Sequence, residues 1–240
     1  MTTVHRLLLA FLVPMILGAC QTDGEIDNPA QRRATWFSFL SGEDIASDCV
    51  ASGRDRLRLI YYADRDVQVR IYDIDLDVTP EPQVRSRVLT FTANDWFPWP
   101  ILTDPTRPFR PFESVARISP DAAQDIVREL LDAGWWTDPP PIGRKIASHS
   151  YAWLIAGCHE GRFAYQVFEY PDDAFLDFRF PATLFANDTT DIDVTPYPDD
   201  GVRRTYSRTF GSVPDTPHDD LYRDRRHNLI VTPNGVDYTG

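Results

Sequence analysis

The stretch that decides the fold is residues 67–77, with the sequence Val-Gln-Val-Arg-Ile-Tyr-Asp-Ile-Asp-Leu-Asp. Apolar and polar side chains alternate along nearly all of it, and a period of two is typical of a β-strand. The preceding stretch, 55–63, alternates in the same way through Leu57, Leu59 and Tyr61. A short polar connection around Asp64 separates the two, so the sequence predicts a β-hairpin.

Further strands follow on both sides of a helical segment. Residues 84–92 predict a third strand, and residues 150–158 and 162–170 predict a second hairpin that turns around His159-Glu160-Gly161. Residues 153–156, Trp-Leu-Ile-Ala, are continuously apolar, which is typical of a strand buried on both faces.

The sequence predicts one main helix over residues 120–133. Ser119 is a suitable N-cap, Pro120 fits the first turn, and Gly134 supplies the C-terminal stop. The apolar side chains fall on one helical face, formed by Ile126, Val127, Leu130 and Leu131.

These elements predict an α+β fold of mainly antiparallel hairpins or a meander, packed by one main helix and rich in loops. We expect the globular domain to span residues 36–187, with no regular element clear beyond Pro171. Residues 188–240 are more polar and predict a partly ordered C-terminal extension, with order most expected around 229–231.

Composition bounds the class of protein. The chain has 240 residues, 42% hydrophobic and 12% aromatic, which is enough apolar material for a core and argues against wholesale disorder. Its 24 basic and 36 acidic side chains give a formal charge of −12. Such a chain binds a phosphate backbone poorly, so nucleic acid is not an expected partner.

The N-terminus has the pattern of an export signal. Arg6 precedes an apolar run from Leu7 to Leu17, which is too short to span a bilayer comfortably. The run ends in Leu17-Gly18-Ala19-Cys20, and this tetrapeptide resembles the lipobox of bacterial lipoproteins.

The resemblance implies that residues 1–19 are removed and that the Cys20 thiol carries diacylglycerol. Gln21, rather than Asp, follows the cysteine, which implies the outer membrane in a host with two membranes. Residues 20–35 are polar and predict a lipidated tether, so the membrane is an expected partner through the N-terminal lipid. The mature part resembles uncharacterised lipoproteins of Gram-negative bacteria, without a motif of a characterised family.

Two cysteines remain once Cys20 is assigned to lipidation. In an oxidising compartment Cys49 and Cys158 can form one disulfide, which is our prediction. Two separate buried thiols and a catalytic cysteine are the alternatives.

No metal or cofactor is predicted. Asp73, Asp75 and Asp77 share one strand face, but the glycine that a calcium loop needs is absent, so we interpret them as a solvated face. His218 and His227 could bind a transition metal together with Asp219 and Asp220 if folded together, but we favour the interpretation of this segment as a polar tail.

Catalytic motifs give no support for an enzyme. Gly-x-Ser-x-Gly is absent, and the adjacent pair His149 and Ser150 would point to opposite faces of a strand. Convergence of His149, His159 or His218 with Asp and Ser in a cleft would favour a hydrolase.

Clustered aromatic side chains are the candidate binding residues of the chain. They occur in an irregular stretch and at the exit of the helix, where they either pack as core or present a recognition surface. These residues are Trp96, Phe97, Trp99, Trp135 and Trp136.

The sequence therefore predicts a lipid-anchored envelope protein that faces the periplasm and has a non-catalytic accessory role, with another envelope protein as a candidate partner. An envelope hydrolase with a dispersed active site and a carrier of a small ligand are the alternatives.

Overall fold

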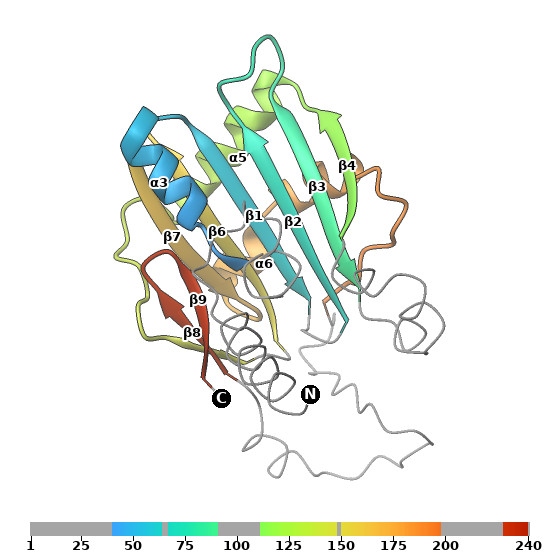
Figure 1. Ribbon diagram of the computed structural model, residues 1–240. Coiled ribbons are helices and arrows are strands. Elements are labelled where there is room, and N and C mark those ends of the chain that lie inside the picture. Colours follow the sequence, from blue (N-terminus) through green and yellow to red (C-terminus); the bar gives the residue numbers. More distant parts are fainter. Residues whose placement is uncertain (1–39, 64–66, 91–110, 148–149, 198–227, 240) are drawn as a thin grey trace, which may run out of the picture.

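A six-stranded antiparallel sheet forms the centre of the protein (Figure 1). The computed structural model describes residues 40–63, 67–90, 111–147, 150–197 and 228–239. Across the sheet the strand order is β4-β3-β2-β1-β6-β7. Its strands are β1 (Arg56–Ala63), β2 (Gln68–Asp75), β3 (Gln83–Thr90), β4 (Phe112–Arg117), β6 (Tyr151–His159) and β7 (Arg162–Glu169).

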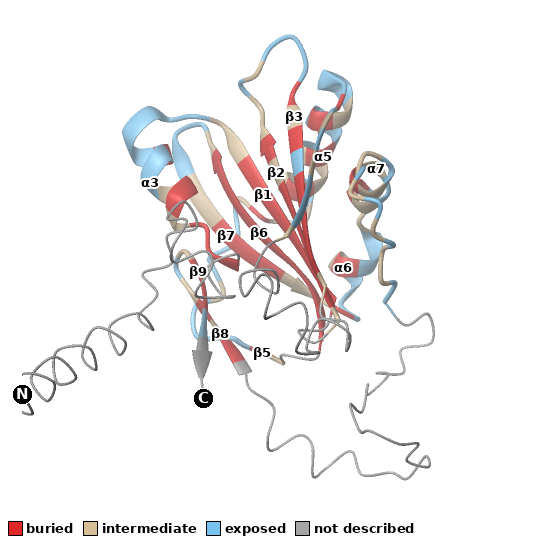
Figure 2. Cartoon of the chain, turned by 45° about the vertical axis from the view of Figure 1, so that its right-hand side comes forward, coloured by how far each residue is buried: buried red, intermediate tan, exposed pale blue. Residues whose placement is uncertain are grey.

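Both faces of this sheet are covered (Figures 1 and 2). One face packs against helix α3 (Glu43–Ser52) and a three-stranded sheet of β5 (Lys145–Ala147), β8 (Asn228–Thr232) and β9 (Gly235–Thr239). The other face packs against α5 (Pro120–Asp132), α6 (Asp173–Asp177) and α7 (Phe180–Ala186). The predicted α+β fold with a β-meander is confirmed. None of the described helices is long and apolar enough to cross a bilayer.

The two predicted hairpins are confirmed, as β1–β2 and β6–β7. Every residue of β6 except His159 is buried, as its apolar run predicted, because β1 and β7 flank it and both sheet faces are covered. The β6–β7 turn places Glu160 at φ 51° and Gly161 at φ 72°. Two consecutive positive φ angles characterise the type I′ turn, whose twist matches that of the strands.

Helix α5 begins and ends as predicted. The Ser119 hydroxyl accepts a hydrogen bond from the N–H of Ala122. At the other end, Gly134 has φ +83°, and the N–H groups of Gly134 and Trp135 donate to the carbonyls of Leu131 and Leu130. This is the Schellman arrangement, which satisfies the last carbonyls of a helix and turns the chain sharply. The turn directs Trp135 back into the core under α5.

Three helices were not predicted. No regular element was clear from the sequence beyond Pro171, but α6 and α7 form there and bury Phe175, Phe180 and Leu184 against the sheet. They are short and supply few turns for a helical period to appear. Helix α3 is longer but buries only three side chains, Asp44, Ile45 and Cys49, and so has no clear apolar stripe.

A buried ion-pair network attaches α3 to the sheet. The Arg58 side chain is 2% exposed and donates two hydrogen bonds to the Asp44 carboxylate, at 2.6 and 2.9 Å. It also donates to Asp73, at 2.6 Å, and to the Ser41 carbonyl, at 2.8 Å. Asp73 in turn pairs with Arg87 of β3. The network therefore joins the N-terminal segment to three neighbouring strands.

The interpretation of Asp73 as part of a solvated face is wrong. Its side chain is only 16% exposed, because α3 lies on this sheet face and brings Asp44 to the same arginine. Burial alone would raise the pKa of Asp73, but the guanidinium groups of Arg58 and Arg87 outweigh it and lower the pKa to about 2. Asp75 and Asp77 are more exposed, and Asp75 pairs with Arg54 at 2.5 Å.

Residues 188–197, assigned from the sequence to a C-terminal extension, pack against β2. Arg70 is buried and pairs with the Asp188 carboxylate at 2.6 Å, and the Tyr72 hydroxyl donates to the same carboxylate at 2.9 Å. The Gln68 amide donates to the Asp193 carbonyl. Farther on, Leu229 and Val231 of β8 lie in the core, in the part of the extension where order was most expected.

The predicted disulfide between Cys49 and Cys158 is confirmed. It joins α3 to β6, with the two Cα atoms 5.5 Å apart and 109 residues between the cysteines. Both cysteines are buried in the core beside α3. The bridge and the Arg58 network thus attach α3 to the sheet at separate points.

Removal of this bridge should destabilise the protein substantially. For a loop of this length the chain-entropy relation gives about 4–5 kcal/mol, because the open chain gains conformational freedom when it unfolds. We expect a loss of this order for the double variant Cys49→Ala/Cys158→Ala in urea unfolding monitored by tryptophan fluorescence. Added reductant should leave the unfolding free energy of this variant unchanged and should lower that of the wild type to the same value. A loss of unfolding free energy under about 1 kcal/mol in the variant would contradict the prediction.

The lowered pKa of Asp73 predicts an acid-dependent loss of stability. A depressed carboxyl pKa stabilises the fold above the unfolded-state value of about 4, and this contribution disappears as the pH falls toward 2. The stability difference between wild type and Asp73→Asn should therefore shrink by about 2 kcal/mol between roughly pH 5 and pH 2. Exposed Gln124, which does not titrate, supplies the control Gln124→Asn, whose stability difference from the wild type should stay nearly constant over the same pH range.

Candidate functional site

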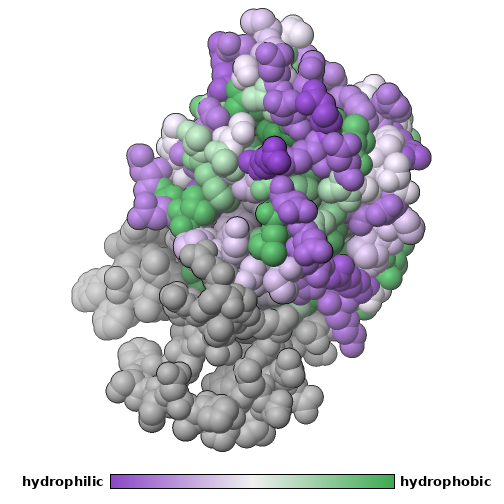
Figure 3. Space-filling model, turned by 180° about the vertical axis from the view of Figure 1, so that it is seen from behind, coloured by the Kyte–Doolittle hydropathy of each residue, from purple (hydrophilic) through white to green (hydrophobic). Residues whose placement is uncertain are grey.

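Helix α5 lies between two concave regions of the surface. The larger, the α5–α7 groove, has a volume of about 640 Å³. The smaller, the His159 cleft, has a volume of about 420 Å³ and lies between α5, the β2–β3 connection and the end of β6. Viewed from behind, the molecule shows apolar residues scattered among hydrophilic ones rather than one continuous apolar patch (Figure 3).

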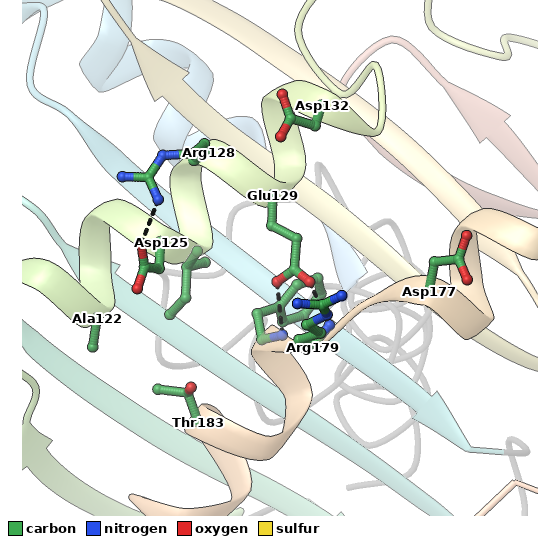
Figure 4. Close-up of a pocket in the computed structure, with 10 residues that line it drawn as sticks. Ala122, Asp125, Arg128, Glu129, Asp132, Asp177, Arg179 and Thr183 are labelled. Carbon is green, nitrogen blue, oxygen red and sulfur yellow. Dashed lines mark hydrogen bonds and ion pairs between the residues drawn. The ribbon is translucent and has the colours of Figure 1, made fainter.

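The α5–α7 groove is polar, and its central carboxylate is already bound. The Glu129 side chain points from α5 toward α7 and accepts hydrogen bonds from the backbone N–H groups of Arg179 and Phe180 (Figure 4). It thus holds the start of α7 against α5. Arg128 on the rim pairs with Asp125 at 2.6 Å. With both groups engaged in intramolecular contacts, the groove is better explained as a helix–helix junction than as a reactive site.

The His159 cleft combines an apolar floor with a polar rim. Leu76, Ala123, Val127 and Leu131 provide apolar surface, together with two prolines, while one histidine and three other polar side chains border it. The full lining is Asp55, Leu76, Pro82, Pro120, Ala123, Gln124, Val127, Arg128, Leu131 and His159. Apolar pockets with a few placed polar groups are the usual form of binding sites.

A histidine–carboxylate pair lies at one end of this cleft. The Nδ1 atom of His159 is 3.0 Å from Oδ2 of Asp55, and Oδ1 of Asp55 accepts the N–H of Glu160 at 3.1 Å. The Asp55 N–H in turn donates to Asp77. Because a carboxylate only accepts hydrogen bonds, Nδ1 of His159 is the donor in this pair, and in the neutral form of the ring Nε2 presents a lone pair. Within the described part of the chain, Nε2 has no hydrogen-bond partner.

Strand pairing and the β6–β7 turn position the pair. Arg56 of β1 is opposite Cys158 of β6, so the residue before β1 and the last residue of β6 lie side by side. Trp136 packs edge-on against the imidazole ring of His159, with ring centroids 5.3 Å apart. The Arg162 guanidinium lies 4.2 Å from the centre of the Trp136 ring and donates to the Trp136 carbonyl. The imidazole is therefore held by contacts on two sides.

The two tryptophans at the helix exit differ in accessibility. Trp135 is fully buried, and a Cβ atom at Gly157 would come within 2.6 Å of its ring, so glycine leaves the space that the indole fills. As a candidate binding residue Trp135 is therefore wrong, because a buried ring cannot contact a partner. Trp136 is half-buried and supports His159. The other candidates, Trp96, Phe97 and Trp99, lie outside the described residues.

Most other candidate residues also lie outside the described part of the chain, namely Cys20, His149, His218 and His227. Ser150 is buried, and its hydroxyl donates to the Ala147 carbonyl. Among the residues that the structure describes, no three His, Cys, Asp or Glu side chains are grouped as a metal site would require.

The Asp55–His159 pair was not predicted from the sequence, where 104 residues separate its members. One signal could have indicated it. The disulfide brings residue 158 close to residue 49, and the predicted strand 55–63 begins only six residues after Cys49. Pairing of that strand with 150–158 would have placed Asp55 near the histidine.

Comparisons with known protein families, with curated proteins and with solved structures found no match for this chain.

Proposed function

We propose that this chain is a lipid-anchored envelope protein whose folded domain is a non-catalytic module that binds another envelope protein through the His159 cleft. The observation that carries the proposal is the combination of an apolar floor with a partly exposed histidine, held by Asp55, at one end. The anchor is proposed from the sequence Leu17-Gly18-Ala19-Cys20, and Gln21 after it favours the outer membrane, on its periplasmic side.

The form of the cleft favours a protein partner over a small-molecule cargo. Carriers usually enclose most of the surface of their ligand. The His159 cleft instead lies along the outer side of α5, where Gln124 and Arg128 are exposed. A shallow apolar depression with a polar rim is suited to a protruding apolar side chain of a partner, since such anchors dominate interface energetics.

The polar rim defines the chemistry of that partner. Asp55 is engaged by His159 and by the backbone of Glu160, so in the neutral form of the ring Nε2 of His159 is the acceptor that remains for a partner at this cleft. Arg128 is engaged by Asp125. The complementary segment thus carries one or two apolar side chains next to a hydrogen-bond donor, such as a hydroxyl or a backbone N–H group.

The same histidine–carboxylate pair also favours the alternative of a hydrolase, since an oriented imidazole is a general base. None of the ten residues that line the cleft is Ser, Thr or Cys. A mechanism that uses a hydroxyl or thiol nucleophile activated by His159 therefore lacks that nucleophile among these described residues, and for this reason we favour binding.

Lipidation can be tested separately from binding. Replacement Cys20→Ala removes the thiol to which diacylglycerol would be attached, so the protein should move from the membrane fraction to the soluble fraction of the envelope. The variant should also lose incorporation of labelled fatty acid, while Cys49→Ala/Cys158→Ala should retain it. Continued membrane association of Cys20→Ala after a high-salt wash would refute the anchor.

Binding in the cleft predicts site-specific crosslinking in cells. A photo-reactive amino acid at exposed Gln124 should yield one defined adduct, whereas the same probe at Val50, which is 89% exposed on α3, should not. Val127→Arg places a charge on the apolar floor and should reduce the Gln124 adduct at least about tenfold, as loss of an interface anchor does.

The matched control is Val50→Arg, which should leave the Gln124 adduct unchanged. Equal adducts from Gln124 and Val50, or an adduct that survives Val127→Arg, would rule out the cleft as the binding site. Hydrolysis of an ester or peptide substrate that is lost in His159→Gln would instead support the enzyme.

A further inference from the structure

The two edges of the six-stranded sheet differ in how they are covered. At the β7 edge, the Gln166 side chain donates to the carbonyls of Asp138 and Pro139, and Arg162 donates to that of Trp136, so residues 136–139 lie against this strand. At the other edge, β4 pairs with β3 alone. Within the described part of the chain, no further backbone hydrogen bond reaches residues 112–117.

The backbone groups that face outward from β4 can be assigned from the register. The N–H of Ile118 donates to the carbonyl of Pro82, so these opposite residues form a hydrogen-bonded pair. Hydrogen-bonded and non-hydrogen-bonded pairs alternate along an antiparallel ladder. Phe112, Ser114 and Ala116 therefore direct their N–H and C=O groups toward β3, while Glu113, Val115 and Arg117 direct theirs toward the open edge.

The side chains of these three outward residues share one face of the sheet and are exposed. Val115, in the centre, is 57% exposed. Glu113 precedes it by two residues and Arg117 follows it by two. Neither of these charged residues forms an ion pair with another described side chain.

The order Glu113, Val115, Arg117 along β4 is self-complementary: a twofold rotation about Val115 brings the positive residue of one copy opposite the negative residue of the other. When two β4 strands pair antiparallel with Val115 opposite Val115, each Glu113 lies opposite an Arg117 of the other copy. All three outward residues then lie in hydrogen-bonded pairs, and opposite charges directly across an antiparallel ladder are stabilising. At the axis, exposed Val115 of one copy comes opposite Val115 of the other, which adds an apolar contact.

Neighbouring registers lack this match. Pairing centred on Ser114 sets Arg117 against Pro111, which has no N–H to donate, and sets Glu113 against Val115. Pairing centred on Ala116 sets Arg117 against Val115. Only the register centred on Val115 joins the two charged residues.

We propose that β4 is a homodimer interface, through which two copies of this chain join their sheets edge to edge about a twofold axis at Val115. The occupant of the edge is a second copy, because the strand matches itself in hydrogen bonding, charge and apolar contact. Symmetric twofold pairing is the commonest arrangement of homo-oligomers. An exposed edge strand without a proline or lysine in its centre is a competent template for such pairing.

Charge reversal followed by mixing tests this register. In Glu113→Arg both copies carry like charges across the axis, and the same holds for Arg117→Glu. Each variant alone should therefore dimerise about tenfold or more weakly than the wild type in sedimentation equilibrium of the full-length protein. An equimolar mixture should regain the dimer, because each positive residue of one variant then faces a negative residue of the other.

The doubly reversed variant Glu113→Arg/Arg117→Glu should also dimerise, and Asp177→Arg, at an exposed site on α6, should leave the dimer unchanged. A monomeric wild type would overturn the proposal, as would a dimer that tolerates both single reversals. Failure of the mixture to associate, with both variants folded by circular dichroism, would overturn the register centred on Val115.

Discussion

The structure depends on the burial of one guanidinium group, that of Arg58. A charge withdrawn from water costs several kcal/mol unless it is fully paired, and Arg58 finds its partners on separate elements. Asp44 is on α3, Asp73 is on β2, and the Ser41 carbonyl belongs to the segment before α3. These elements must therefore assemble together with β1 for the charge to be tolerated. Asp73 extends the requirement to Arg87 on β3.

The same constraint positions the candidate site. With α3 fixed by Arg58, Cys49 reaches Cys158, and the bridge holds the end of β6 next to the beginning of β1. Asp55 and His159 occupy those two positions and are thus paired by covalent and strand geometry rather than by their mutual attraction alone. A site carried on such rigid elements keeps its geometry without help from a ligand.

What the sequence could predict was local. Periodicity of two identified β1, β2, β3, β6 and β7, and capping residues identified α5, because these signals lie within a few residues of each other. Alternation also placed Asp73 on the sheet face opposite to that of Ile74, as in the structure. It could not reveal that α3 covers this side, since coverage depends on contacts between distant parts of the chain. Likewise, the sequence alone did not distinguish the buried Trp135 from the half-buried Trp136, because their different burial follows from the Schellman turn after α5.

Local sequence patterns do not give the order of the strands in the sheet. The proposed function depends on that order, because it decides which residues lie side by side and which strand lies at the edge. Glu113, Val115 and Arg117 form an alternating pattern of charged and apolar residues. On a central strand this pattern would have no role in dimerisation, because both neighbouring strands would belong to the same chain. Because β4 is the edge strand among the described strands, the same three residues have no partner strand on one side within that part of the chain. At this edge a second copy can place its Arg117 opposite Glu113 and its Glu113 opposite Arg117, so the symmetric placement of the two charges favours pairing between copies.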